Sequence, residues 1–516
     1  MSEEQPAPLL VQHMRVIWRD TFVFAPARPT ADKSLRHLHE RLAALPAFTA
    51  SGQTERSAQP ELLSLTERVS RGVAGIGHPD LLRVQFQPLR ITDLDPMLDR
   101  LRIKPLDLTP GDVRAAAADA DLRAAWITVT PLLVLHRAGV AIMTYHADMR
   151  AGAHLSEGFT PDEAITLVRL GISTGLLGLN AAWRSMLPPD PAAWGIGQPV
   201  DDAGGEALVV AGLRDLTQGV IAPVLGLPRK PPRRRRRQPA PSIPPRPTGS
   251  ATVVLARTLP RPGMDFDAFV DEHGPPLRGI GAMDSFYAER APWIVARELH
   301  DNLCSDAEGA VYLLGNSELI LLNEDGPAVL ESIRSRLRLK DTGDALTYWV
   351  MHYVVLLEWV YIQDAILRMY IQRLDTLAAN PTPQRRDLIA ALQGALADMV
   401  QYQENITPYA TRVEFLERAR RFHKIDELAE RFERKQDLLL SYISEYHDYR
   451  DARASEFLNW LAGILAGAEL ANLLVAAFGI SPETNRTLFL GVTLGSVLLV
   501  FLIMGVILRQ ARRWGR

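Results

Sequence analysis

The chain has 516 residues, a formal net charge of −3 at pH 7 and 47% hydrophobic residues. The length is enough for roughly two or three domains, and a charge so close to neutral excludes the strongly basic surface of a nucleic-acid-binding protein. A single cysteine, Cys304, excludes a disulfide framework and any metal site built from several cysteines.

Residues 1–228 mix strand and helix patterns, which predicts an N-terminal α/β domain. The predicted elements are strands at 14–25 and 82–89, a helix at 34–44, and a hairpin at 127–146. Thr160 and Pro161 predict a helix start, because threonine is a good N-cap and proline fits the first helical position. The apolar stretch 171–183 could form a third membrane span, but Arg169, its three glycines and its polar flanks favour a buried helix. The acidic start of the chain has no apolar run behind a basic stretch, which predicts no signal peptide.

Residues 229–250 are rich in proline and arginine, a composition that cannot build a core and therefore predicts a linker. Two interpretations are open. The segment is either a solvated spacer or a basic strip on anionic lipid headgroups, where each basic residue contributes on the order of 1 kcal/mol. The candidate lipid-contacting residues are Arg233, Arg234, Arg235, Arg236 and Arg237.

Residues 251–343 predict a second α/β subdomain, with a strand at 251–259 and a hairpin at 310–322 that leads into a helix. This order of hairpin and helix repeats that of residues 127–170. The repeat is compatible with an internal duplication, but such hairpins are also common in α+β proteins without one.

Residues 344–456 predict a helical stalk. The stretch 345–379 has no proline or glycine and is dense in aromatic and aliphatic residues, so its helix is expected to be buried on more than one side. From Tyr409 onward no proline or glycine occurs until Gly463, which allows a single helix of about 80 Å at about 1.5 Å per residue. Its apolar residues recur every three or four positions, as in helices that pack in a bundle.

Two apolar runs, 457–480 and 487–508, are each long enough to span a bilayer, which needs roughly 20 apolar residues. The loop between them, 481–486, is short and makes the two spans antiparallel. The tail at 509–516 carries four arginines, and the positive-inside rule places it in the cytoplasm together with the N-terminus. The predicted fold class is therefore α+β cytoplasmic domains followed by a long helical stalk and a two-helix transmembrane hairpin in the plasma (inner) membrane.

This organisation resembles the CorA family of divalent-cation channels over residues 250–516, from the cytoplasmic α/β domain through the long stalk helix to the basic tail. The resemblance implies a homo-oligomer of five chains whose first span lines a pore for a divalent cation such as Mg²⁺, with no other cofactor. In that family a Gly-Met-Asn signature closes the first span. The corresponding residues here are Gly479, Ile480 and Ser481. A serine ring offers smaller dipoles to hydrated Mg²⁺, so altered ion selectivity is expected.

The resemblance also implies a set of pore-lining residues on the first span. They are Ser455, Leu461, Leu465, Glu469 and Ser481. Glu469 is also supported by its own chemistry, because an ionisable group near the middle of a span costs several kcal/mol when it faces lipid. It is expected to face a pore or, alternatively, to pack against Asn472 of a neighbouring helix. In the second span, Gly491 and Gly495 form a small-xxx-small motif that favours close helix packing.

The sequence carries no catalytic motif, and no enzyme activity is predicted. His37 and Glu40 have no third ligand at helical spacing, and Gly279 with Gly281 lacks the third glycine of a dinucleotide-binding loop. The leading hypothesis is conduction of divalent cations through the first span. The alternative is a membrane-anchored sensor or effector of a bacterial stress or conflict system without selective metal transport, in which residues 1–228 bind an unidentified partner or ligand.

Overall fold

The structure is a computed structural model of the whole chain. It describes residues 8–23, 31–49, 62–72, 81–93, 109, 111–113, 126–136, 138–151, 158–201, 205–221, 224–225, 250–263, 265–301, 303–306, 309–315, 317–378, 410–477, 487, 490–492, 494–496, 498–499 and 502. The chain divides into two compact units. The first consists of residues 1–379 and 389–433, and the second of residues 380–388 and 434–516.

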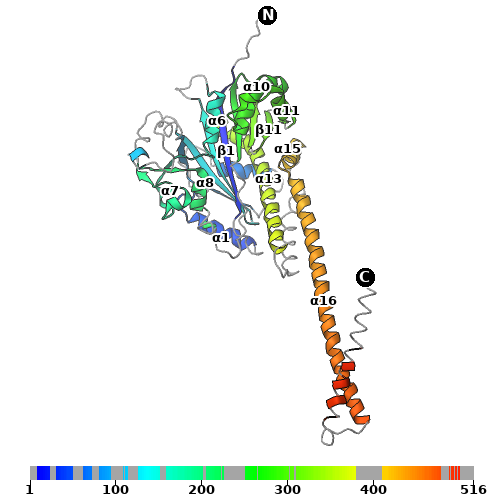
Figure 1. Cartoon of the computed structure of the whole chain (residues 1–516). Helices are drawn as coiled ribbons and strands as arrows, with labels where there is room; N and C mark the ends of the chain where they lie inside the picture. Colours follow the sequence, from blue (N-terminus) through cyan, green and yellow to red (C-terminus); the bar gives the residue numbers. More distant parts are fainter. Residues whose placement is uncertain are drawn as a thin grey trace. The chain divides into compact units, whose positions relative to one another are not determined.

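Twelve strands among the described residues form one mixed sheet in the first unit (Figure 1). They are β1 (Leu10–Val23), β2 (Leu81–Gln85), β3 (Leu89–Thr92), β4 (Ile127–His136), β5 (Val140–Arg150), β6 (Gly175–Leu179), β7 (Val200–Asp201), β8 (Ala207–Ala211), β9 (Ser250–Leu259), β10 (Leu303–Asp306), β11 (Gly309–Leu314) and β12 (Ser317–Leu322). The order across the sheet is β10-β11-β12-β9-β1-β5-β4-β3-β6-β8-β7, and β2 also pairs with β4.

The two predicted soluble segments, 1–228 and 251–343, share this sheet. β1 pairs antiparallel with β5 along one edge and with β9 along the other. In this register Arg15 lies opposite Asp148 of β5 and Val254 of β9. One hydrophobic core contains residues of both segments, so they form a single folded body rather than two separate cores.

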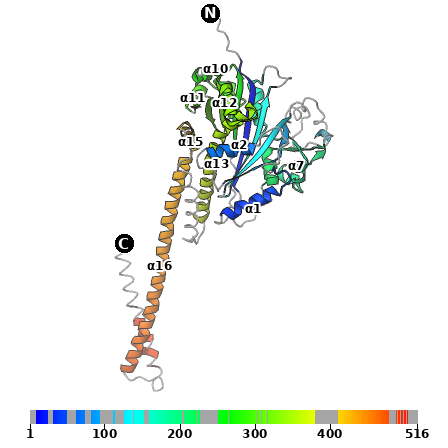
Figure 2. The same cartoon turned by 180° about the vertical axis from the view of Figure 1, so that it is seen from behind.

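Helices cover both faces of the sheet. They are α1 (Ala31–Ala43), α2 (Leu62–Gly72), α6 (Pro161–Arg169), α7 (Ala181–Ser185), α8 (Leu213–Leu216), α10 (Phe266–Ala282), α11 (Pro292–Asp301), α12 (Gly326–Leu337), α13 (Thr342–Ala378), α15 (Ala410–Phe422) and α16 (Ile425–Ala477), with short turns η2 (Pro191–Trp194), η3 (Thr217–Ile221) and η4 (Tyr287–Glu289). The helices α6, α10 and α11 contact one face, whereas α13 contacts β1, β5 and β9 from the other, with α2 beside it (Figure 2).

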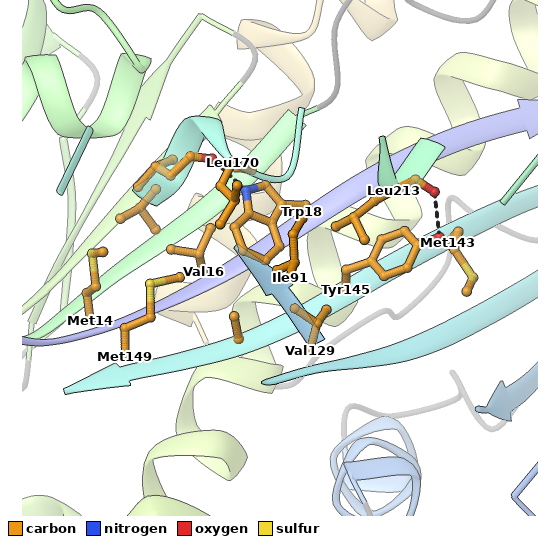
Figure 3. Packing of buried hydrophobic residues seen from close by; sticks show 14 of the residues in the cluster. Met14, Val16, Trp18, Ile91, Val129, Met143, Tyr145, Met149, Leu170 and Leu213 are labelled. Atoms are coloured by element: carbon orange, nitrogen blue, oxygen red, sulfur yellow. Dashed lines mark hydrogen bonds between the residues drawn. The ribbon is translucent and has the colours of Figure 1, made fainter. Parts of the chain in front are cut away.

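The face under α6 and α10 is apolar. Trp18 of β1 is 2% exposed, and its indole Nε1 donates a hydrogen bond of 2.6 Å to the carbonyl of Val168 in α6 (Figure 3). Tyr145 of β5 donates from its hydroxyl to the carbonyl of Leu213 at 2.9 Å. Both aromatic residues are thus buried with their polar ends paired, which avoids the cost of an orphaned donor.

The predicted strands and hairpins are present, and so is the helix start at Thr160. The Thr160 hydroxyl accepts from the backbone N–H of Glu163 in a capping box. The prediction of a buried helix at 171–183 is wrong, because residues 175–179 form β6, every residue of which is buried. A strand buried on both faces lacks the polar alternation that would separate it from a buried helix.

The predicted helix 345–379 is confirmed as α13, which is buried on most of its surface. The prediction of a single helix from Tyr409 is wrong at one point, because α15 ends at Phe422 and α16 begins at Ile425. Between them Lys424 has a φ of 57°, in the left-handed region, where a right-handed helix cannot continue. We call His423 and Lys424 the helix junction.

Among the described residues, one helix is long and apolar enough to cross a membrane. It is the stretch Thr342–Thr376 of α13, and 94% of its most apolar window is buried inside the fold. The core helix of a folded domain has the same properties, so this stretch by itself is weak evidence for a membrane. The predicted spans are described only in part: α16 is helical to Ala477, residues 478–486 lie outside the described residues, and those described between 487 and 502 are helical.

The repeat of hairpin and helix is present as β4-β5-α6 and β11-β12-α12. Its two copies join the sheet differently, because β5 pairs antiparallel with β1 whereas β12 pairs parallel with β9. This difference in strand direction argues against a simple internal duplication.

Candidate functional site

The face of the sheet that α13 covers is polar. Arg15 donates to the hydroxyl of Thr347 in α13, and alternate residues of a strand share one face. In the register of β1 and β5, residues on this face of β1 lie beside residues on the same face of β5, so that polar side chains extend across both strands. We call the set the polar face, and its members are His13, Arg15 and Arg19 of β1 and Thr144, His146, Asp148 and Arg150 of β5.

A cavity of about 260 Å³ lies where the polar face meets α2 and the first turns of α13. We call it the polar cavity. It is lined by Arg15, Leu62, Leu65, Thr128, Thr130, His146, Ala147, Asp148, Arg150, Asp341, Gly343, Asp344 and Thr347. Two guanidinium groups and three carboxyl groups therefore border this small space, together with apolar surface that includes Leu62, Leu65 and Ala147.

Asp148 is the centre of the basic side of the polar cavity. Its Oδ1 accepts a hydrogen bond of 2.6 Å from His13 Nε2 and lies 3.7 Å from Arg15 Nε, and its Oδ2 accepts from Arg150 at 3.1 Å. Burial alone would raise the pKa of Asp148. The hydrogen bond from His13 and the charges of the two arginines outweigh it and hold the pKa below its usual range. Asp148 is therefore a permanent anion that orients both arginines.

The acidic side of the polar cavity is the start of α13. Asp341 Oδ1 accepts from the backbone N–H of Asp344 at 2.9 Å, so Asp341 caps the helix. The side chain of Asp344 is 8% exposed, and its Oδ2 has no hydrogen-bond partner among the described residues. Burial raises the pKa of Asp344, and the neighbouring charge of Asp341 adds to the shift. Hydrogen bonds from the backbone N–H groups of Asp341 and Lys340 and the charge of Lys340 oppose this shift. The unpaired acceptor is therefore the single atom Oδ2 of Asp344.

The hydroxyl oxygen of Thr144 lies 3.2 Å from the carbonyl of Leu132 and 3.0 Å from His146 Nε2. With the hydroxyl hydrogen donated to the carbonyl, which has no hydrogen of its own, Nε2 donates to the hydroxyl and Nδ1 is an acceptor. That Nδ1 has no partner among the described residues. Burial, with the charges of Arg15 and Arg19, lowers the pKa of His146 to about 3, so the ring is neutral at pH 7.

This neutral imidazole predicts acid sensitivity. Between about pH 6.5, the ordinary histidine pKa, and the native value of about 3, the unfolded chain binds a proton that the native His146 does not. The free energy of unfolding should therefore fall with falling pH, by at most about 1.4 kcal/mol per pH unit from this group.

We expect His146→Gln to make that slope shallower, as measured by urea unfolding of the detergent-solubilised protein at a series of pH values. His352, whose burial lowers its pKa to about 4, adds a similar contribution that remains in the variant. The matched control is His37→Gln on the exposed side of α1, which should leave the slope unchanged. An unchanged slope in His146→Gln would contradict the assignment.

A second buried polar group ties the sheet to the middle of α13. Arg19 of β1 forms an ion pair with Glu318 of β12, and both side chains are fully buried. Glu318 also accepts from the hydroxyl of Tyr361 in α13 at 2.8 Å and from that of Thr252 in β9 at 2.8 Å. The guanidinium carbon of Arg19 lies 4.8 Å from the centre of the Tyr361 ring, a cation–π contact. Four elements thus meet at one charge pair.

Below this group α13 packs along α15 and the start of α16. Tyr353 contacts Phe415 with ring centres 5.3 Å apart, and Tyr370 contacts Phe432 at 6.4 Å. Tyr361, which binds Glu318, also lies 5.0 Å from the ring of His423 at the helix junction. One helix therefore borders the polar cavity at its first residues and the beginning of α16 further along.

The predicted pore residues lie in the second unit and are only partly described. Ser455 and Glu469 are exposed in α16 of the single chain. Leu461 and Leu465 belong to α16, but their side chains lie outside the described part of the structure. The signature residues Gly479, Ile480 and Ser481 and the arginines Arg233 to Arg237 are outside the described residues altogether. A Cβ added at Gly491 or Gly495 would meet nothing within 4 Å, so any helix packed there comes from outside this chain's described residues.

The polar cavity joins residues that the sequence reading did not single out. One local pattern could have indicated the polar cavity: in β1 and β5, charged or polar residues alternate with apolar ones, although both strands are otherwise deeply buried. No three metal-ligating side chains gather among the described residues, so the structure offers the polar cavity no metal centre there. A scan against models of known protein families and a search of curated proteins find no match to this chain.

Proposed function

We propose that this chain is a homo-oligomeric membrane protein of CorA-like organisation, whose first predicted span lines a path for divalent cations. The observation that carries the proposal is α16, a single helix of 53 residues from Ile425 to Ala477. At about 1.5 Å per residue it is roughly 80 Å long. Its first turns are part of the folded core, because Ile425, Leu428 and Phe432 are buried, and its last twenty or so residues are those of the predicted span.

The exposed side of α16 supports the oligomer. Described residues that are exposed in the single chain recur every three or four positions, which places them on one helix face. They are Ser455, Leu458, Ala462, Ala466, Glu469 and Leu473. A carboxylate on this face within a membrane costs several kcal/mol in lipid. Further copies of the chain around a water-filled path would remove that cost.

The proposal is tested with purified protein in lipid vesicles, by comparing conductance for Mg²⁺, Co²⁺, Zn²⁺ and K⁺ and by measuring the oligomeric state. Glu469→Ala should lower divalent conductance about tenfold or more, because a ring of carboxylates raises the local cation concentration by that order. The matched control is Glu433→Ala, an exposed acid of the same helix outside the predicted span, which should conduct normally. Normal conductance in Glu469→Ala would remove Glu469 from the path, and a silent wild type would reject the channel.

A second function is favoured by the polar cavity: a membrane-anchored sensor that transports no metal. In this case the soluble unit recognises a ligand, and α13 passes the change to the start of α16 through its aromatic contacts with α15 and α16. A wild-type protein that is silent for all four ions but binds a small ligand would support the sensor over the channel.

A further inference from the structure

We infer that the polar cavity binds a small zwitterion, a molecule of amino-acid size that carries a protonated amine and an anionic group a few bonds apart. The inference deepens the proposed function by naming the ligand that the soluble unit recognises, and its test does not depend on ion conduction. It is carried by the size of the cavity, by two acceptor atoms without donors on its lining residues and by the two arginines that also line it.

Size sets the first limit. Pockets for drug-sized ligands measure about 300–1,000 Å³, and the polar cavity, at about 260 Å³, lies just below that range. Gly343 keeps the space open, because a Cβ there would lie 3.1 Å from Asp341 Oδ1 and 3.3 Å from Arg150 Nη2. A dinucleotide or a peptide does not fit in this volume, whereas a single small metabolite does.

The amine is argued from the unpaired acceptors. Asp344 Oδ2 and His146 Nδ1 both belong to lining residues that are 8% exposed, and neither atom has a hydrogen-bond partner among the described residues. A buried polar atom without a hydrogen-bond partner is destabilising, and more so when it is charged. An ammonium group carries three N–H donors and one positive charge, so it matches acceptors of this kind and balances the Asp344 carboxylate.

The anionic group is argued from Arg15 and Arg150. Both arginines contact Asp148, but each guanidinium has five N–H donors, and the contacts to Asp148 and Thr347 use only some of them. A carboxylate or a single phosphate-like group suits the remaining donors. Three carboxyl groups among the lining residues disfavour a polyphosphate.

Such a ligand would add a link between α13 and the strands β1 and β5, beside the existing contact of Arg15 with Thr347. Its amine would bind α13 through Asp344, and its anionic group would bind β1 and β5 through Arg15 and Arg150. The start of α13 would then be held to the polar face. Because α13 also contacts Phe415 and His423, occupancy of the cavity would bias the packing of the helix junction.

The experiment is isothermal titration calorimetry of the full-length protein in detergent. Each proteinogenic L-amino acid is titrated as a separate probe at concentrations up to about 1 mM. At that limit, ligands with a binding free energy of about −4 kcal/mol or stronger are detected. Each probe that binds is titrated again as its N-acetyl derivative and as its carboxamide. We expect at least one amino acid to bind and both blocked forms to bind at least tenfold more weakly. Asp344→Asn and Arg150→Gln should each weaken binding by a similar factor. Arg334→Gln, which removes an exposed arginine paired only with Glu331 in α12, should not.

Two outcomes overturn the inference. One is that no amino acid binds. The other is that inorganic phosphate or a blocked derivative binds as tightly as the free amino acid with no effect of Asp344→Asn, which would make the cavity a plain anion site. Failure here is distinct from failure of the channel, because a conducting protein without amino-acid binding removes only this inference. A silent protein that binds removes only conduction.

Discussion

Replacement of Glu318 with glutamine is expected to lower the free energy of unfolding by about 3–5 kcal/mol. The amide keeps the size of the side chain but removes its charge, which leaves the Arg19 guanidinium buried without a counter-ion. The Arg19 Nε and Nη1 already have no hydrogen-bond partner among the described residues, so the ion pair and the ring of Tyr361 are what compensate this charge. The measurement is urea unfolding of the detergent-solubilised protein, followed by tryptophan fluorescence.

The exposed pair Arg334 and Glu331 provides the control. Glu331→Gln removes an ion pair at the surface of α12, where such pairs contribute about 0–1 kcal/mol. A double replacement, Arg19→Met with Glu318→Leu, should recover most of the stability lost in Glu318→Gln, because an apolar pair avoids burying any charge. A loss in Glu318→Gln no larger than that in Glu331→Gln would contradict the account.

Replacement of Trp18 with alanine is expected to cost about 3–5 kcal/mol, the range for large aromatic residues in a core. The change opens a cavity and leaves the carbonyl of Val168 without the indole donor. The ring also lies directly on Gly171, where an added Cβ would fall 2.2 Å from Trp18 Cδ2. Gly171→Ala should therefore destabilise the wild type by about 1–3 kcal/mol through overpacking.

The two changes form a double-mutant cycle. In the Trp18→Ala background the space above Gly171 is free, so Gly171→Ala should cost much less there than in the wild type. The control is Trp293→Ala, since Trp293 is 66% exposed and its loss should change stability by no more than about 0.5 kcal/mol. Equal costs of Gly171→Ala in both backgrounds would show that the ring does not meet this glycine.

Local elements of the fold could be predicted from the sequence because their patterns are local. The hairpin at residues 127–146 has its turn between two alternating strands, and the capping threonine at 160 marks a helix start within four residues. Pairing of β1 with β9 could not be predicted, since it joins residues about 240 positions apart and has no local pattern. The left-handed Lys424 was missed for a related reason, because lysine carries no preference that marks a break in a helix.

The candidate site was predictable only in its parts. The charged residues of β1 were visible as an alternation, but their partners lie in β5, β12 and α13, which the sequence places far away. Whether a buried arginine has a partner depends on such long-range contacts. The same contacts therefore determine which side chains come together in a site. Glu469 is a different case, since it was singled out by the resemblance to the CorA family and by its place within an apolar run. Neither argument needs a distant partner in the same chain, and its role stays a prediction.

The burial of α13 has a consequence for the proposed membrane topology. This helix is synthesised before the two predicted spans and is apolar enough to be taken for a span itself. A chain with three crossings would end on the opposite side of the membrane from its start, whereas two crossings return it to the same side. Under the proposed topology, early folding of α13 against the polar face keeps the number of crossings even. The carboxylate of Glu358, which accepts from Arg83 of β2 at 2.9 Å, also opposes entry of this helix into lipid. Under that topology, the charge pair that binds the helix to the sheet would therefore also preserve the orientation of the chain.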